Sequence, residues 1–190
     1  MDEAFRTIGQ LAVRCGHYCW LEHRLFGLTG SRASASAVGA AEIRVFLSVK
    51  AARHAFLADP WRDRLPVRAG IDPETLIVAP PGGATEAMEI LQAESDLLIV
   101  LSGLVGAVLP RLLDTYQRDL VQSSPVSEAP VRAVLEVAVG WGTHELGEGR
   151  RLLERVGPRS ETAGPLAASR ARLQRRLGPD TGIFPAASAS

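Results

Sequence analysis

The sequence predicts a single all-helical domain. Apolar residues recur every three or four positions along residues 4–29, as in Ile8, Ala12 and Cys15, and this spacing is typical of an amphipathic helix. No strand pair, internal repeat or heptad array is evident in the sequence. The stretch Leu97–Leu109 is uncharged, but it is shorter than the roughly 20 residues that a bilayer-spanning helix needs. We therefore expect a central helix that other helices cover on every side.

Composition limits the class of protein further. At 190 residues the chain is long enough for one domain with a full core. Its 21 basic and 21 acidic residues leave no net field to attract nucleic acid or an anionic membrane. The first residues lack the basic-then-apolar pattern of a signal peptide, so we expect a cytoplasmic location. Cys15 and Cys19 stand one helical turn apart, which suits a reducing compartment better than a disulfide.

The first half of the chain reads as two helices and a long connection. A helix is predicted over residues 4–29 and ends at Gly30, and a second over residues 37–58 ends before Pro60. The short linker between them, residues 31–36, makes them antiparallel neighbours. Proline and glycine then recur through residues 59–84, which predicts a crossover of roughly 25 residues without a long regular element.

The second half reads as two long helices and a tail. The third helix is predicted from Thr85 to Val121, with a kink near Pro110. The fourth begins after Ser127 as its N-cap and ends at Val156. Residues 1–157 would therefore form a four-helix bundle. Residues 158–190 would carry a short arginine-rich helix over 166–177 and a disordered tail over 178–190.

Two short hairpins joined by one long crossover resemble the ferritin-like superfamily. The segments Trp20-Leu-Glu-His23 and Trp61-Arg-Asp-Arg-Leu-Pro66 resemble actinobacterial members of that superfamily. An arginine-rich composition with a single lysine also suits a high-GC genome. The resemblance covers residues 4–156 and implies a ferritin-like four-helix bundle.

Di-metal members of the superfamily place a Glu on each of two helices and a Glu-x-x-His on each of the other two. In this chain Glu22 matches a lone carboxylate. The position three before His54 is Ala51, the position three before His144 is Trp141, and no Glu-x-x-His occurs anywhere. The resemblance therefore implies a lost or reduced di-metal site.

Four residues are candidates for a smaller site. His144 and Glu148 share a helix face one turn apart, and with Glu22 and His54 they would bind one metal ion or act as acid and base without metal. The alternative is structural, because a His–Glu pair at this spacing is commonly a surface ion pair. Glu22 lies on an apolar stripe and needs a partner, which is Arg53, His54, a metal or a ligand.

The aromatic residues Tyr18 and Trp141 are candidates to line a pocket between helices. Gly103 and Gly106 leave room beside the central helix for close packing or for a small apolar ligand, and in the second case they also line the pocket. Two common catalytic motifs are absent from the sequence. Pro80-Pro-Gly-Gly83 lacks the Gly-Lys-Ser/Thr ending of a phosphate loop, and no Gly-x-Ser-x-Gly occurs.

Three functions remain open from the sequence. The first is a bundle without a di-metal centre that binds a small molecule or performs metal-independent catalysis, with no cofactor and a role in specialised metabolism. The second is a non-haem iron oxygenase that uses Glu22, His54, His144 and Glu148. The third is an interaction scaffold that uses the arginine-rich helix or an exposed face of the bundle. A homo-oligomer is compatible with each of them.

Overall fold

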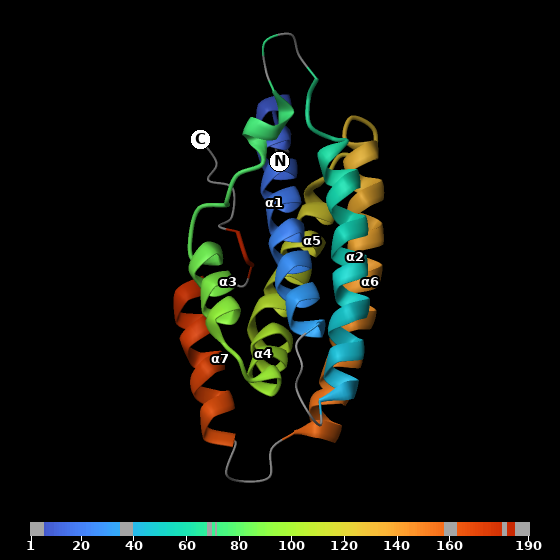
Figure 1. Ribbon diagram of the computed structural model, residues 1–190. Helices are drawn as coiled ribbons and strands as arrows, with labels where there is room; N and C mark the ends of the chain where they lie inside the picture. The colour runs from blue at the N-terminus through green and yellow to red at the C-terminus, as the bar shows by residue number, and fades with distance from the viewer. Residues whose placement is uncertain are drawn as a thin grey trace.

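The computed structural model describes residues 6–34, 40–67, 70, 72–157, 163–179 and 182–184. Over these ranges the chain is helical and contains no strand (Figure 1). The prediction of an all-helical protein is confirmed.

Helix α1 spans Ile8–Ala33 and α2 spans Ala41–Arg62. Thr7 and Gln10 form a capping box at the start of α1, in which each side chain accepts a hydrogen bond from the other residue's backbone N–H. The predicted starts at residues 4 and 37 lie outside the described residues. Both predicted ends are wrong, because α1 continues past Gly30 and α2 continues past Pro60. Trp61 is fully buried, and this burial favours the last turn of α2.

The connection after α2 contains two short helices. Residues Pro73–Leu76 form the 3-10 helix η1, and Ala84–Ala93 form α3. The chain leaves helical geometry at Glu94, whose ψ is 131°. Asp96 then caps a new helix by accepting hydrogen bonds from the N–H groups of Leu98 and Ile99. The prediction of one helix from Thr85 to Val121 is therefore wrong.

The central helix has three parts: α4 (Leu97–Gly103), the π-helical segment η2 (Leu104–Val108) and α5 (Leu109–Gln122). Hydrogen bonding changes from α to π just before Pro110, which has no N–H to donate to the carbonyl four residues earlier. The segment Leu97–Gln122 has the length and hydropathy of a membrane span, but 61% of its most apolar window is buried inside the molecule. It lies in the core, as predicted.

Helix α6 spans Ala129–Val156 and α7 spans Ala163–Leu177. Pro130 lies in the first turn of α6, where its missing N–H costs nothing. The N-cap is Glu128 and no side chain caps this end, so the assignment of Ser127 as N-cap is wrong. The Ser127 N–H instead donates to Ser124 Oγ in the preceding turn.

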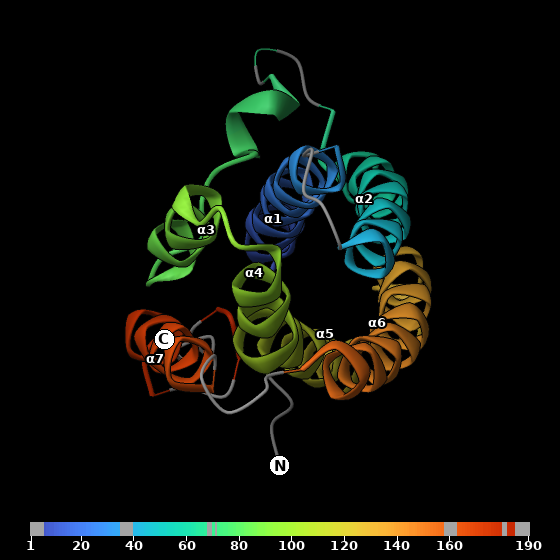
Figure 2. The same cartoon turned by 60° about the horizontal axis from the view of Figure 1, so that its bottom comes forward.

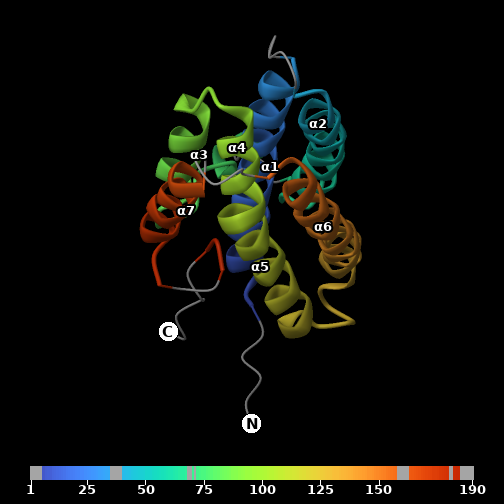
Figure 3. The same cartoon turned by 90° about the horizontal axis from the view of Figure 1, so that it is seen from below.

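Four long rods surround the core in the order α1, α2, α6 and α4–α5 (Figure 2). Neighbouring rods are antiparallel. Arg6, just before α1, pairs with Asp119 near the end of α5. Glu42, at the start of α2, pairs with Arg155 near the end of α6. Helices α3 and α7 lie outside this ring and pack against each other (Figure 3). Helix α7 packs on the central helix, and α3 packs on α1 and reaches the central helix through Leu91.

The C-terminal segment is attached to the bundle. Arg111 donates hydrogen bonds to the carbonyls of Leu177 and Gly178 at the end of α7. Ile183 and Phe184 are buried, and the Phe184 ring lies 5.0 Å from that of Tyr18. The prediction of a disordered tail is wrong for residues 182–184. Its remaining part, residues 180–181 and 185–190, lies outside the described residues.

Candidate functional site

Glu22, His54 and Tyr116 meet in the core, each from a different helix. His54 Nδ1 lies 2.6 Å from Glu22 Oε2, and the Tyr116 hydroxyl donates to Glu22 Oε1. Glu22 is fully buried and His54 is 4% exposed. Burial raises the pKa of Tyr116 well above its usual value, and the Glu22 charge raises it further. Both oxygens of the Glu22 carboxylate thus have a protein partner. One partner is His54, which was among the partners that the sequence predicted for Glu22.

The far side of the His54 ring is unused. Its Nε2 atom is buried and has no hydrogen-bond partner among the described residues. A carboxylate that accepts the Nδ1 proton fixes the ring orientation and leaves Nε2 of the neutral imidazole as a proton acceptor. The site therefore holds a histidine that Glu22 orients and whose second nitrogen has no partner among the described residues.

Aromatic rings close one side of this cluster. Tyr18 stacks on Trp61 with ring centroids 4.6 Å apart, and Tyr116 lies 4.8 Å from Tyr18. Trp61 is parallel to Tyr116 to within 11°. The three rings belong to α1, α2 and α5, so the stack joins the same helices as the Glu22 cluster. Tyr18, predicted to line a pocket, lies in a packed stack.

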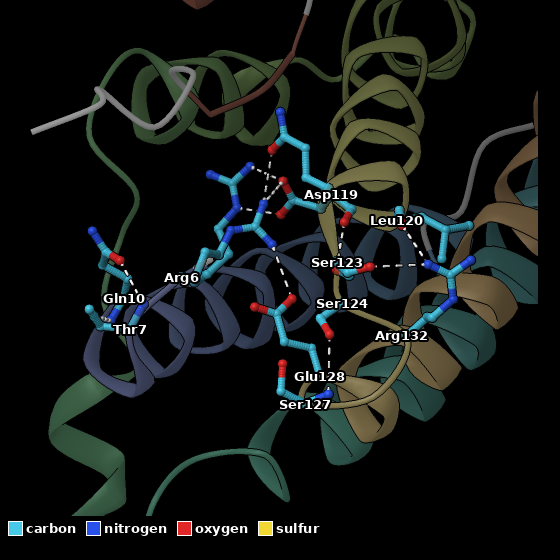
Figure 4. Close-up of polar contacts among 12 residues, drawn as sticks. Arg6, Thr7, Gln10, Asp119, Leu120, Ser123, Ser124, Ser127, Glu128 and Arg132 are labelled. Carbon is cyan, nitrogen blue, oxygen red and sulfur yellow. Dashed lines mark hydrogen bonds and ion pairs between the residues drawn. The ribbon is translucent and has the colours of Figure 1, made fainter. Parts of the chain in front are cut away.

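A second buried carboxylate, Asp119 on α5, joins the start of α1 to the end of α5. It accepts hydrogen bonds from Arg14 at 2.6 and 3.0 Å, from Arg6 at 2.8 Å and from the Tyr18 hydroxyl at 2.6 Å. Figure 4 shows the same arginine, Arg6, reaching Glu128 before α6. Burial and the Asp119 charge raise the pKa of Tyr18 well above its usual value. This network fixes three chain segments to one another.

A third buried carboxylate, Glu145, joins α6 to α2. Its oxygens pair with Lys50, which is 1% exposed, and with Arg53 at 3.0 Å. Burial lowers the pKa of Lys50, while Glu145 opposes that effect. Neither Glu145 nor Asp119 was predicted from the sequence. A signal was present for Asp119, because it follows Leu112 by seven positions and Tyr116 by three on one helix face.

His144 and Glu148 lie away from the core. They form an ion pair with Nε2 and Oε1 3.3 Å apart, and their side chains are 59% and 41% exposed. The buried face of α6 contains Glu145, and a step of one residue turns His144 by about 100° toward solvent. The structure therefore brings Glu22 and His54 together but separates them from His144 and Glu148. Within the described ranges, no three His, Cys, Asp or Glu side chains are grouped to hold a metal ion.

The predicted pocket beside the central helix is filled. A Cβ on Gly103 would lie 2.7 Å from the side chains of Leu91 and Leu173, and a Cβ on Gly106 would lie 2.5 Å from Arg170. Trp141 is partly exposed on the outside of α6 and packs beside Phe56. Gly103 and Gly106 therefore lie where α3 and α7 pack closely on the central helix, which is one of the two uses that the sequence left open for them. Of the other two predicted pocket-lining residues, Tyr18 lies in the aromatic stack and Trp141 packs on Phe56.

One shallow groove of about 510 Å³ lies at the C-terminal end of α7, far in sequence from the Glu22 cluster. It is lined by Arg111, Ala171, Gln174, Arg175, Gly178 and Pro179. Comparison of the chain with family models, with curated proteins and with solved structures found no match.

Proposed function

We propose that this chain is a cytoplasmic, ferritin-like bundle without the di-metal centre, and that it performs metal-independent acid–base chemistry on a small molecule through His54. The observation that carries the proposal is the buried Nε2 of His54, which has no hydrogen-bond partner in the described part of the chain, although Glu22 holds Nδ1. An imidazole oriented by a carboxylate is the usual arrangement of a general base. The antiparallel order of the four rods and the connection of two helical hairpins by a long crossover support the ferritin-like assignment.

The residues have distinct roles in this proposal. His54 accepts a proton at Nε2, and Glu22 is a positioning residue that fixes the ring and stabilises its protonated form. Tyr116 occupies the second carboxylate oxygen, so Glu22 cannot rotate away from His54. Because His54 is 4% exposed, a reactant larger than water reaches Nε2 only when neighbouring side chains move.

The iron alternative does not fit the residues. Of its four ligands, Glu22 and His54 are buried together, while His144 and Glu148 are on the surface. Both oxygens of Glu22 already have protein partners. A shared ion requires all ligand atoms within about 2–2.3 Å of it, and this set would need α6 to rotate.

Carbethoxylation by diethyl pyrocarbonate, mapped by mass spectrometry, tests the proposal. The reagent attacks an unprotonated imidazole nitrogen, so His54 of the folded chain should react, more slowly than the exposed His144. Glu22→Gln should slow the His54 reaction, because the neutral amide no longer holds the ring or supports positive charge on it, and should leave the His144 rate unchanged. Two results would overturn the proposal: His54 unmodified when His144 is fully modified, or an unchanged His54 rate in Glu22→Gln.

A further inference from the structure

The outer face of α2 carries an apolar stripe that is exposed to solvent. Val45, Val49, Ala52 and Phe56 are exposed and follow one another at spacings of four, three and four. Val45 is 65% exposed, Val49 42% and Phe56 58%. The core side of the same helix is a separate set that includes Leu47, His54 and Leu57. Helix α2 is therefore apolar on two opposite sides, of which folding covers one.

Helix α6 widens this stripe. The Trp141 ring lies 5.1 Å from that of Phe56, and Val137, one turn before Trp141, is 42% exposed. A Cβ added to the neighbouring Gly140 would meet nothing within 4 Å. The residues that form this α2–α6 patch are Val45, Val49, Ala52, Phe56, Val137 and Trp141.

The charges at the margins of the patch are already neutralised. Arg155 pairs with Glu42 at 2.9 Å at one end. Arg53, beside Trp141, pairs with Glu145 at 3.0 Å. Docking of an apolar partner would therefore leave no buried charge without a counter-ion at these positions.

We propose that the α2–α6 patch is the interface of a two-fold symmetric homodimer. Apolar positions at alternating spacings of four and three form the seam by which one helix packs against another. A second copy of the chain presents the same seam, and a two-fold interface pairs a patch with itself. A two-fold axis that passes between Val49 and Ala52 places the Val45 end of the stripe on one copy against the bulky Phe56 end of the stripe on the second copy.

The size of the patch agrees with a dimer. The stripe covers about 17 Å of α2 at 1.5 Å per residue, and Trp141 and Val137 extend it onto α6 at its Phe56 end. A standard interface buries about 800 Å² per partner, of which somewhat more than half is apolar. A contiguous exposed apolar patch of a few hundred Å² is often an interaction surface.

Sedimentation of the full chain tests this interface. The wild type, of 20.3 kDa per chain, should sediment as a dimer, and Val49→Glu should sediment as a monomer with the same helical circular dichroism. Val121→Glu is the matched control, because Val121 is 85% exposed at the end of α5, and it should remain dimeric. A monomeric wild type at about 100 μM, where a Kd in the micromolar range saturates, would overturn the proposal, as would a dimeric Val49→Glu.

Cross-linking gives a second measurement that does not weaken the patch with a charge. Both native thiols are buried, and burial raises the pKa of Cys15 to about 12 and that of Cys19 to about 11. A short bis-maleimide should therefore link only the thiols of a Val49→Cys variant and give a covalent dimer. Val121→Cys should remain uncross-linked. Equal cross-linking of the two variants would contradict the proposed interface, even if Val49→Glu failed to fold.

Discussion

At the scale of single residues, buried carboxylates join the helices of this bundle, and three of them have well-defined partners on other helices. Glu22, Asp119 and Glu145 each receive hydrogen bonds or ion pairs from a different helix. Burying an ionised group is costly unless partners satisfy it. These acids therefore join helices through donors that the protein itself supplies.

The two tyrosines give a prediction of pH dependence. They are the only tyrosines in the chain, and burial beside a carboxylate raises the pKa of both Tyr18 and Tyr116. Above pH 10, the unfolded chain loses phenolic protons that the folded chain retains, so the free energy of unfolding should fall as pH rises. The slope should reach up to about 1.4 kcal/mol per pH unit for each tyrosine.

Absorbance at 295 nm checks this prediction. Phenolate should appear only with the cooperative loss of helical circular dichroism, because both hydroxyls stay protonated while the chain is folded. Urea unfolding at pH 9, 10 and 11 gives the free energies. A tyrosine that ionises near pH 10 in the folded chain would contradict the placement of its hydroxyl on a buried carboxylate.

The Glu145 pair gives a second prediction at this scale. Glu145→Leu leaves Lys50 charged and buried, so it should lower the free energy of unfolding by about 3–5 kcal/mol. Adding Lys50→Met should restore most of the loss, because two apolar side chains then replace the pair. Glu148→Ala on the same helix breaks an exposed pair and should cost about 1 kcal/mol or less. Urea unfolding measures all three, and a double variant no more stable than Glu145→Leu would contradict the argument.

At the scale of elements, the docking of the crossover depends on close backbone contact. A Cβ on Gly16 of α1 would overlap the carbonyl oxygen of Leu76 in η1. Gly16→Ala should therefore cost about 1–3 kcal/mol, an overpacking penalty that exceeds the gain of about 1 kcal/mol in helix propensity. Gly140→Ala on α6, where a Cβ meets nothing within 4 Å, should instead be stabilising. Equal effects of the two substitutions on the urea midpoint would show that η1 is not held against α1.

The sequence predicted which long helices form better than it predicted the residues at which they begin and end. Periodicity found the long helices, because burial of one face requires it. It missed the break between α3 and α4, since Asp96 acts as a cap only where the chain turns away from α3. Tertiary packing can override the residues that usually end a helix. Helix α2 continues past Pro60 because the extra turn buries Trp61.

A residue of the candidate site could be predicted only where the pattern of its own helix showed that it is buried. Glu22 stood out because a carboxylate lay on an apolar stripe, and it is buried. His144 also lay on a helix beside an acid, but the sequence did not show which face of α6 turns inward. The partners of a buried charge come from helices far apart in sequence, as with Arg14 and Asp119. One sequence alone does not show which of these helices meet, so it does not identify the partners.

At the scale of the whole molecule, α7 is part of the core, although its composition suggested a contact arm. Leu173 is fully buried, and its side chain lies against the surface of Gly103 on the central helix. Its arginines Arg172 and Arg175 are exposed. The helix therefore covers apolar surface of α3 and α4, and its charged side faces solvent.

Two substitutions on α7 separate these roles. Leu173→Ala should lower the free energy of unfolding by about 2–5 kcal/mol, as do large-to-small changes in packed cores, and should increase the binding of a hydrophobic dye. Arg172→Ser, on the exposed side, should change stability by no more than about 0.5 kcal/mol. The reverse order of effects in urea unfolding would mean that α7 contributes through its charges. The expected order would mean that the central helix needs α7 as a cover, because Leu173 packs on Gly103 together with Leu91 of α3.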